Sequence, residues 1–334
     1  MIKEAIAKAV DRINLTETEM TAAFSEIFAG EATNAQIAAL VTAMRMKGET
    51  IEEITACARV MRSHALPLNA EGDLLEIVGT GGDCAKTFNI STTSAFIIAA
   101  GGIRVAKHGN RCVSSRSGAA DVLEALGADI SIEPEQARRQ LDGCGMVFLF
   151  SQKYHSAMRF AGPVRKEIGI RTVFNILGPL TNPAQANMEV MGVYDKKLVE
   201  PLAHVLSNLG VKRGLVVNGA GLDEFSLTGI NTVAEIDNGR ITVSELDPQS
   251  LGLEPCTRED IMGGDADTNA AITRAILNGE ERGAKRSTVL LNAAAGLYVG
   301  GRAAGLQEGL KLAEELLDSG RALQVMEKFV ALSR

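Results

Sequence analysis

The feature that most constrains the fold is a short apolar run at residues 74–78, which passes directly into a glycine-rich turn at residues 79–82. The run is rich in branched residues and predicts a buried strand. Glycines after a strand allow backbone N–H groups to approach an anion closely. Residues 89–92 then offer hydroxyls and an N-cap for a helix expected over residues 93–100. This strand, turn and helix predict a phosphate site.

Positive charge gathers around the same stretch, although the whole chain has a formal net charge of −7. Residues 84–120 hold no acidic side chain, but they hold the cations Lys86, Arg104, Lys107, Arg111 and Arg116. Local positive charge within an acidic chain predicts an anionic ligand.

Two common phosphate loops do not match this turn. The dinucleotide-binding fingerprint requires a last glycine where Cys84 stands, and no Gly-Lys-Ser/Thr follows as in an ATP-binding P-loop. The sequence therefore gives little support to an NAD or ATP site.

Four segments occur in a specific order: GTGGD at residues 79–83, NIST at 89–92, KHGNR at 107–111 and NILGPLTNP at 175–183. Together they closely resemble the anthranilate phosphoribosyltransferase family, and the resemblance covers nearly the whole chain. It implies transfer of the phosphoribosyl group of 5-phospho-α-D-ribose 1-diphosphate to the amine of anthranilate, with release of diphosphate, in L-tryptophan biosynthesis. It also implies two Mg²⁺ ions per subunit.

Residues 1–66 predict helices only. Three capping boxes follow one another, at Thr16 with Glu19, Thr33 with Gln36 and Thr50 with Glu53. We expect a small N-terminal helical domain over residues 1–72. Its spare apolar surface either packs on the rest of the chain or also forms a homodimer interface.

After residue 72, predicted strands alternate with helices, which indicates an α/β domain with a mainly parallel central sheet flanked by helices. The strands are expected at residues 74–78, 104–106, 146–150, 189–194 and 214–218, and helices at 119–126 and 197–209. Residues 237–240, DNGR, predict a hairpin that adds an antiparallel part. By resemblance, an insertion at about 163–185 joins the helical domain, so the α/β domain that binds phosphoribosyl pyrophosphate comprises residues 73–162 and 186–334.

Composition limits the class of protein. With 334 residues, of which 46% are hydrophobic, the chain is long enough for two domains. Five cysteines without a Cys-x-x-Cys pair favour neither a disulfide framework nor a zinc site, and a reducing cytoplasm fits best. No export signal and no apolar run long enough to cross a membrane is evident. An estimated pI of 5.3 argues against nucleic acid as a partner.

The resemblance implies which residues bind phosphoribosyl pyrophosphate. They are Gly79, Gly82, Asp83, Thr87, Asn89, Ile90, Ser91, Thr92, Lys107, Asn110, Arg111, Ser114, Ser115 and Ala119. The loop from Lys107 to Ser115 is expected to close over this substrate, and Lys107 to stabilise phosphate charge directly. Ala119 stands where the family often has a serine, so a backbone N–H at a helix start would have to replace the hydroxyl.

A carboxylate pair, Asp223 and Glu224, follows a predicted strand and two glycines. Ligands of open α/β sheets bind at the carboxyl ends of strands, so both side chains can reach one pocket. Mg²⁺ prefers such hard oxygen ligands. An isolated Asp-Glu pair is more often solvated surface, but the resemblance assigns Asp223, Glu224 and Ser91 to magnesium.

Anthranilate requires a cation for its carboxylate and flat or small groups for its ring. By resemblance, Arg165 binds the carboxylate, with further contacts from Gly79, His108, Asn110, Gly178 and Pro179. The aromatic amine is neutral at pH 7, so no general base is required. Lys107 and His108 are the catalytic candidates, and His108 is expected to position the substrate, whereas His155 has no motif around it and is expected to be structural.

Three alternatives remain open at this point. A pyrimidine nucleoside phosphorylase-like enzyme shares the predicted architecture, but it is expected to be longer and not to need Asp223 and Glu224. A non-catalytic relative that binds nucleic acid is disfavoured by the acidic charge. An unrelated sugar-phosphate enzyme is the third.

A separate amidotransferase component of anthranilate synthase is a possible partner.

Overall fold

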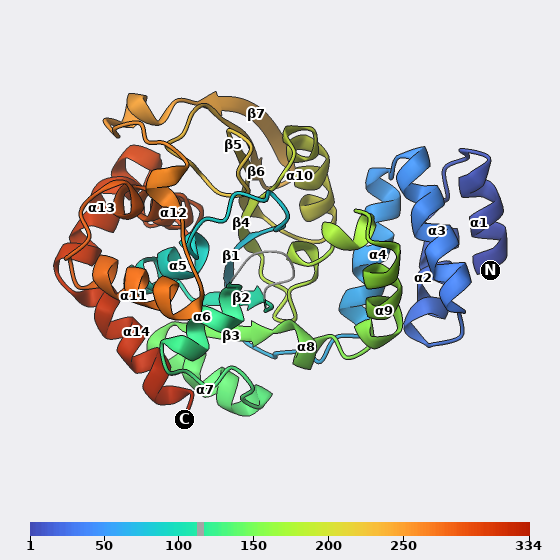
Figure 1. Cartoon of the computed structure of the whole chain (residues 1–334), viewed down its shortest axis with the longest axis horizontal. Helices are drawn as coiled ribbons and strands as arrows, with labels where there is room; N and C mark the ends of the chain where they lie inside the picture. The colour runs from blue at the N-terminus through green and yellow to red at the C-terminus, as the bar shows by residue number, and fades with distance from the viewer. Residues whose placement is uncertain (112–116) are drawn as a thin grey trace.

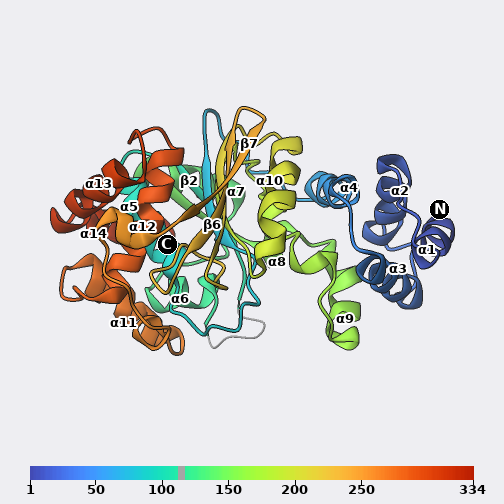
Figure 2. The same ribbon diagram turned by 90° about the horizontal axis from the view of Figure 1, so that it is seen from above.

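The computed structural model describes residues 1–111 and 117–334. Four helices form the N-terminal end of the molecule: α1 (Ile2–Val10), α2 (Glu17–Phe28), α3 (Asn34–Lys47) and α4 (Ile51–Ser63). All three predicted capping boxes are present, since each N-cap threonine accepts from the N3 backbone and each N3 side chain accepts from the N-cap backbone. In Figures 1 and 2 these helices lie at one end of the molecule, and the C-terminal helices lie at the other.

A seven-stranded sheet of order β3-β2-β1-β4-β5-β6-β7 occupies the centre of the larger part. The strands are β1 (Leu75–Gly79), β2 (Val105–Gly109), β3 (Met146–Phe150), β4 (Met188–Gly192), β5 (Arg213–Gly219), β6 (Asn231–Asp237) and β7 (Arg240–Leu246). The first five run parallel, and β6 and β7 form the predicted antiparallel hairpin. The mainly parallel sheet predicted from the sequence is therefore confirmed.

One predicted strand boundary is wrong in a way that matters for the site. The strand expected at residues 104–106 runs from Val105 to Gly109, because its ladder with β3 continues as far as Gly109 paired with Phe150. Lys107 and His108 therefore lie in a buried strand and not in a closing loop.

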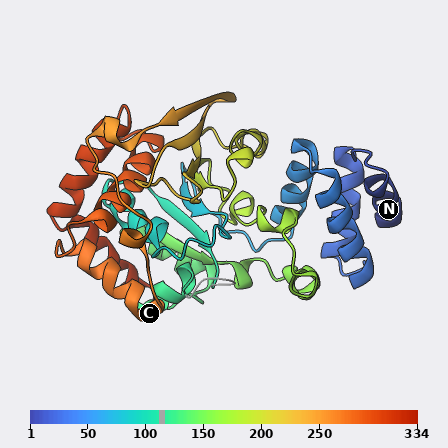
Figure 3. The ribbon, with the colours of Figure 1, turned by 45° about the horizontal axis from the view of Figure 1, so that its top comes forward.

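Helices cover both faces of the sheet, as Figure 3 shows. On one face the core is formed with α5 (Ile90–Ala100), α12 (Ala284–Val299), α13 (Leu306–Asp318) and α14 (Arg321–Leu332). On the other face α10 (Val199–Asn208) packs on β5, β6 and β7 and shares a core with α2, α3 and α4. The remaining helices are α6 (Ala119–Ala125), α7 (Pro134–Cys144), α8 (Ser151–Tyr154), α9 (Met158–Ile168) and α11 (Ala266–Leu277).

The segment around Pro163 returns to the N-terminal helices. Helix α9 packs against α2 and α3, and the short helix η2 (Pro179–Thr181) contacts α4. The stated domain division, with an insertion at about 163–185, stays a prediction. Within the described residues, no helix has the length and apolar character needed to cross a membrane.

Candidate active site

The site lies at the carboxyl ends of the parallel strands, where β1 has β2 on one side and β4 on the other. Gly79 and Gly192 are register partners at the ends of β1 and β4. A Cβ on Gly79 would lie 2.3 Å from Asp223 Oδ2, and a Cβ on Gly192 would lie 1.6 Å from the Asp223 carbonyl oxygen. Only glycine at both strand ends leaves room for Asp223, whose carboxylate also accepts a 2.6 Å hydrogen bond from Gly81 N–H. Ligands of open α/β sheets bind at such a reversal of strand order.

Glu224, Ser91 and Lys107 meet beside Asp223. The Ser91 backbone N–H, in the first turn of α5, donates to Glu224 Oε1 at 3.2 Å. Lys107 Nζ donates to Ser91 Oγ at 3.1 Å and to the Ile77 carbonyl oxygen at 2.6 Å. An ammonium has three N–H groups, so one remains after these two bonds. Helix α5 begins at Ile90, three residues earlier than predicted, which places Ser91 inside the helix and makes its N–H an anion donor.

The two carboxyl groups are held in an environment that disfavours their charge. Burial, Asp83 and Glu224 raise the pKa of Asp223 well above its ordinary value. Burial raises the pKa of Glu224 to about 7, although Lys107 opposes the shift. Burial also lowers the pKa of Lys107. Binding of a divalent cation by Asp223 and Glu224 would offset this cost, and their hard oxygen atoms suit Mg²⁺.

His108 is neutral and fully engaged. Its Nδ1 lies 3.1 Å from the Gly178 carbonyl oxygen, and its Nε2 lies 2.7 Å from Ser151 Oγ. Because a carbonyl can only accept, Nδ1 carries the hydrogen and Nε2 accepts from the serine hydroxyl. Burial, together with the neighbouring His155 ring at 4.9 Å between centroids, lowers the pKa of His108 well below its ordinary value. This arrangement fits a positioning role better than proton transfer.

Arg165 lies on α9 with its guanidinium over the Phe174 ring, 5.6 Å from the centroid. The side chain is half-buried, burial lowers its pKa, and it forms no ion pair with an acid in the described part of the chain. A half-buried arginine without an acidic partner in the described residues is suited to an anionic ligand. Pro179 is buried, and Gly178 has open space where a Cβ would lie.

Comparisons with known proteins identify the family of the chain. Residues 3–65 match the family model for the glycosyl transferase family helical bundle domain, and residues 71–323 match the model for the a/b domain of that family. The anthranilate phosphoribosyltransferase of Methanobrevibacter smithii is 54% identical over 99% of this chain and 98% of its own length. The chain belongs to the anthranilate phosphoribosyltransferase family. The family predicted from the four sequence motifs is thus confirmed.

Other relatives also match this chain over nearly their full length. The enzyme of Lachnoclostridium phytofermentans is 54% identical over 100% of this chain and 99% of its own length. Among solved structures, the Thermus thermophilus anthranilate phosphoribosyltransferase superposes with a TM-score of 0.94 at 45% identity, covering 99% of both chains. The Saccharomyces cerevisiae enzyme in complex with PRPP and Mg superposes with a TM-score of 0.90 at 27% identity, covering 99% of this chain and 97% of its own.

Several predicted family contacts lie near the Gly79 turn without meeting the carboxylates directly. Gly82 accepts from the guanidinium of Arg171, and Thr87 forms an isolated bridge with Met262. Asn89 precedes α5 without a side-chain cap bond, while Ile90 and Thr92 are buried in its first turn. Of these residues, Asn89, Ile90 and Thr92 thus lie at the start of α5.

The positive charge expected from the sequence converges only in part. Arg104 pairs with Asp142 at 2.6 Å. It precedes β2, so it lies at the amino-terminal ends of the parallel strands, opposite to the site. Arg111, a predicted phosphate contact, pairs with Asp121 at 3.0 Å and with Glu124. The two acids neutralise its charge because α6 brings them beside it.

The remaining predicted contacts lie after β2, at the start of α6 or outside the described residues. Exposed Asn110 follows β2, and its Oδ1 accepts from Gln152 at 3.3 Å. Ala119 is the first residue of α6, with Gly118 as N-cap, so its N–H is at a helix start. Ser114, Ser115 and Arg116 lie outside the described residues.

Sequence reasoning missed three members of the site. The exposed Arg171 bonds Gly82 and stacks on Tyr194 at 4.2 Å, and no motif marked it. Glu76 and Asn182 form a buried pair beneath His108, with Asn182 Nδ2 donating to Glu76 Oε2 at 2.7 Å. Asn182 belongs to the NILGPLTNP segment, so its place in that motif was a usable signal.

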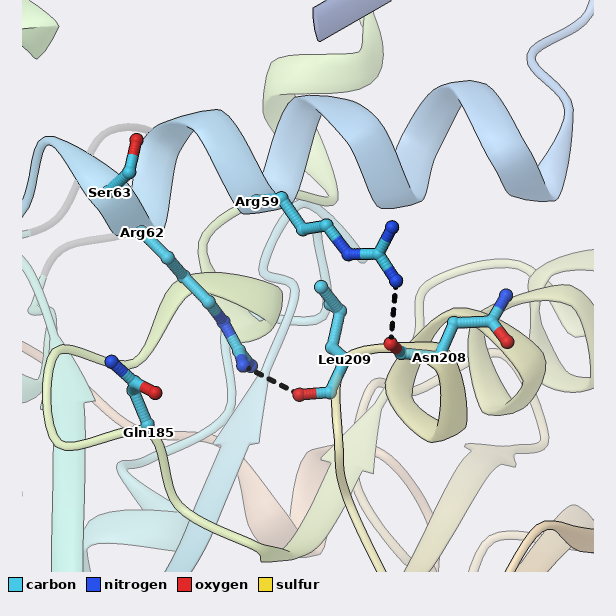
Figure 4. A pocket seen from close by; sticks show the side chains of 6 residues that line it. All are labelled: Arg59, Arg62, Ser63, Gln185, Asn208 and Leu209. Carbon is cyan, nitrogen blue, oxygen red and sulfur yellow. Dashed lines mark hydrogen bonds between the residues drawn. The ribbon is translucent and has the colours of Figure 1, made fainter. Parts of the chain in front are cut away.

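A pocket of about 310 Å³ lies away from these residues, between α4 and α10 (Figure 4). Arg59 and Arg62, both on α4, donate at 3.0 Å to the carbonyl oxygens of Asn208 and Leu209. These carbonyls end α10, and cations are favourable at a helix C-terminus. The pocket therefore marks a contact between the N-terminal helices and the α/β part, and none of the predicted site residues lines it.

Proposed function

We propose that this chain transfers the phosphoribosyl group of 5-phospho-α-D-ribose 1-diphosphate to the amine of anthranilate, giving N-(5-phosphoribosyl)anthranilate and diphosphate for L-tryptophan biosynthesis. The observation that carries the proposal is the meeting of Asp223 and Glu224 with the Gly79 turn and the start of α5. Two residues adjacent in sequence thereby contact the two elements that are proposed to bind phosphate. Full-length similarity to named anthranilate phosphoribosyltransferases supports it.

The donor substrate is proposed to lie over the turn and the N-terminus of α5. The backbone N–H groups there and the remaining N–H of Lys107 are suited to phosphate oxygens. Asp223, Glu224 and the Ser91 hydroxyl would hold magnesium, and two ions per subunit are proposed. When bound, magnesium supplies positive charge that offsets the charge developing on the departing diphosphate.

The acceptor is proposed to lie between α9 and the end of β2. Arg165 binds the anthranilate carboxylate, and Gly178 and Pro179 line the ring. His108 holds the Gly178 carbonyl with its Nδ1–H and so keeps that wall of the pocket in place. No base is needed, because the neutral aromatic amine attacks first and loses its proton afterwards.

A homodimer formed through the helical domain is part of the proposal. Four apolar side chains on or beside α1 and α3 are between 51% and 71% exposed: Met1, Val10, Ile13 and Met46. Exposed apolar side chains of this density at one end of a molecule favour an interface. Sedimentation at micromolar concentration that returns a monomer would contradict it. A cytoplasmic location and association with an anthranilate synthase component are proposed as well.

The test is to mix the protein with anthranilate, phosphoribosyl pyrophosphate and Mg²⁺ and to follow the loss of anthranilate fluorescence. We expect turnover that requires all three components. Orotate and nicotinate serve as control acceptors and should not be consumed. Turnover of either control, or none of anthranilate, refutes the proposal.

A further inference from the structure

The parallel ladder between β1 and β2 breaks just before the site. The two strands are in register only at Leu75 with Val105, whereas β2 stays paired with β3 along its full length. In a continued ladder, the His108 N–H would donate to the Ile77 carbonyl oxygen. It donates instead to Glu76 Oε1 at 3.0 Å.

Two ionisable side chains replace the missing ladder bond. The Ile77 carbonyl oxygen accepts from Lys107 Nζ, and the His108 N–H is taken by Glu76. The side chains come from opposite faces of the sheet. Leu75, Ile77 and Val105 belong to the core on the α5 side, and side chains alternate along a strand. Lys107 therefore rises from the α5 face and Glu76 from the other.

The second oxygen of Glu76 ties this break to the acceptor side. Asn182 Nδ2 donates to Glu76 Oε2 at 2.7 Å and to the Ala106 carbonyl oxygen at 2.8 Å. Asn182 follows η2, and Gly178 precedes it. The Gly178 carbonyl oxygen accepts a hydrogen bond from His108 Nδ1. One carboxylate thus fixes the backbone of His108 and the segment that receives the His108 ring.

We propose that Glu76 is a positioning residue for phosphoribosyl transfer: it holds the β1–β2 ladder open, so that Lys107 and His108 are presented to the two substrates. This inference rests on the proposed function. Nothing else in the described part of the chain bonds the His108 N–H, and every atom of Glu76 is buried. Burying a carboxyl group costs free energy unless it is hydrogen-bonded, and the two bonds that Glu76 accepts are the one that replaces the ladder bond of His108 and the one from Asn182.

The chain offers a matched control. Glu189 is the register partner of Glu76 on β4, is equally buried, and neither of its oxygens has a hydrogen-bond partner. Glu189→Gln therefore changes an adjacent buried carboxyl without touching the ladder break. In Glu76→Gln, one amide oxygen can still accept from His108, but the NH₂ group faces the NH₂ group of Asn182. Two donors cannot bond each other, so the segment after η2 must move.

The experiment measures kcat and KM for both substrates in wild type, E76Q and E189Q, per folded molecule. We expect E76Q to lower kcat by at least about tenfold and to raise KM for anthranilate by about threefold or more, with E189Q within about twofold of wild type. A purely structural role would reduce the active fraction and leave KM unchanged. Equal kinetics for E76Q and E189Q, or a normal KM in E76Q, would overturn the inference.

A second variant guards against misfolding. Asn182, which is not part of the sheet, donates to Glu76 Oε2, and Asn182→Ser removes this amide donor. Like E76Q, this variant should raise KM for anthranilate. If neither variant folds, Glu76 is required for folding and the positioning role is rejected. A wild type without activity would refute the proposed function itself, and that result differs from all of these.

Discussion

Replacing Gly79 by alanine tests the geometry on which the site depends. The added Cβ would lie 2.3 Å from Asp223 Oδ2 and 2.8 Å from the Asp223 carbonyl oxygen. An ordinary van der Waals contact requires about 3.5 Å, so the carboxylate must retreat by about 1 Å. The hydrogen bond from Gly81 N–H, 2.6 Å long, is then lost. Gly79 has no positive φ, so steric displacement alone causes the effect.

The expected magnitudes follow from that displacement. Overpacking of this kind costs about 1–3 kcal/mol of unfolding free energy. A displacement of about 1 Å of a group that positions the reaction costs on the order of 100-fold in kcat/KM. Half-saturation by Mg²⁺ should move to higher concentration, because Asp223 is a proposed ligand. Fluorescence-monitored turnover over a magnesium titration, together with thermal unfolding, measures both quantities.

Gly305 provides the control. It is the N-cap of α13 with extended backbone, and nothing lies within 4 Å of a Cβ built on it. Gly305→Ala should therefore leave turnover and magnesium dependence unchanged. If Gly79→Ala retained the wild-type dependence on magnesium and at least about half of the wild-type kcat/KM, the placement of Asp223 against the strand end would be wrong.

Three further predictions follow from single residues. Arg165→Ala removes a cation that has no acidic partner, so it should raise the apparent KM for anthranilate at least about tenfold, with a smaller change in kcat. The control Arg159→Ala, on the same helix, should leave this KM unchanged. An unchanged KM in Arg165→Ala would exclude Arg165 as the carboxylate ligand. Asp223→Asn should greatly reduce turnover, and excess Mg²⁺ should restore it only in part; full activity at ordinary magnesium would contradict the metal site. Burial raises the pKa of Glu76 to about 8, so the stability that this group contributes is complete below about pH 4.5 and is lost as the pH rises through about 8. Burial also raises the pKa of Glu189 well above its ordinary value, so the stability that Glu189 contributes is likewise lost as the pH rises toward that raised pKa. Glu189→Gln should make the free energy of unfolding, measured with denaturant at pH 5 and pH 8.5, fall less steeply than in wild type; parallel curves would disprove this.

The sequence determined the features that depend on neighbours along the chain. Thr33 and Gln36 satisfy each other's backbone three residues apart, so the start of α3 was readable in advance. The apolar run before Gly79 predicted β1 within one residue at each end. Local hydrogen bonds and periodicity decide such features, and four ordered motifs were enough to predict the family.

Only the tertiary structure decided which charges meet. Asp223 reaches the Gly81 N–H across 142 residues, and no local rule predicts that contact. The acids that neutralise Arg111 come from α6, and the partner that fixes the backbone of His108 comes from β1. The reason is physical: a charge gains its partner or its burial from packing between distant segments, and the interrupted β1–β2 ladder exists only once the sheet has formed.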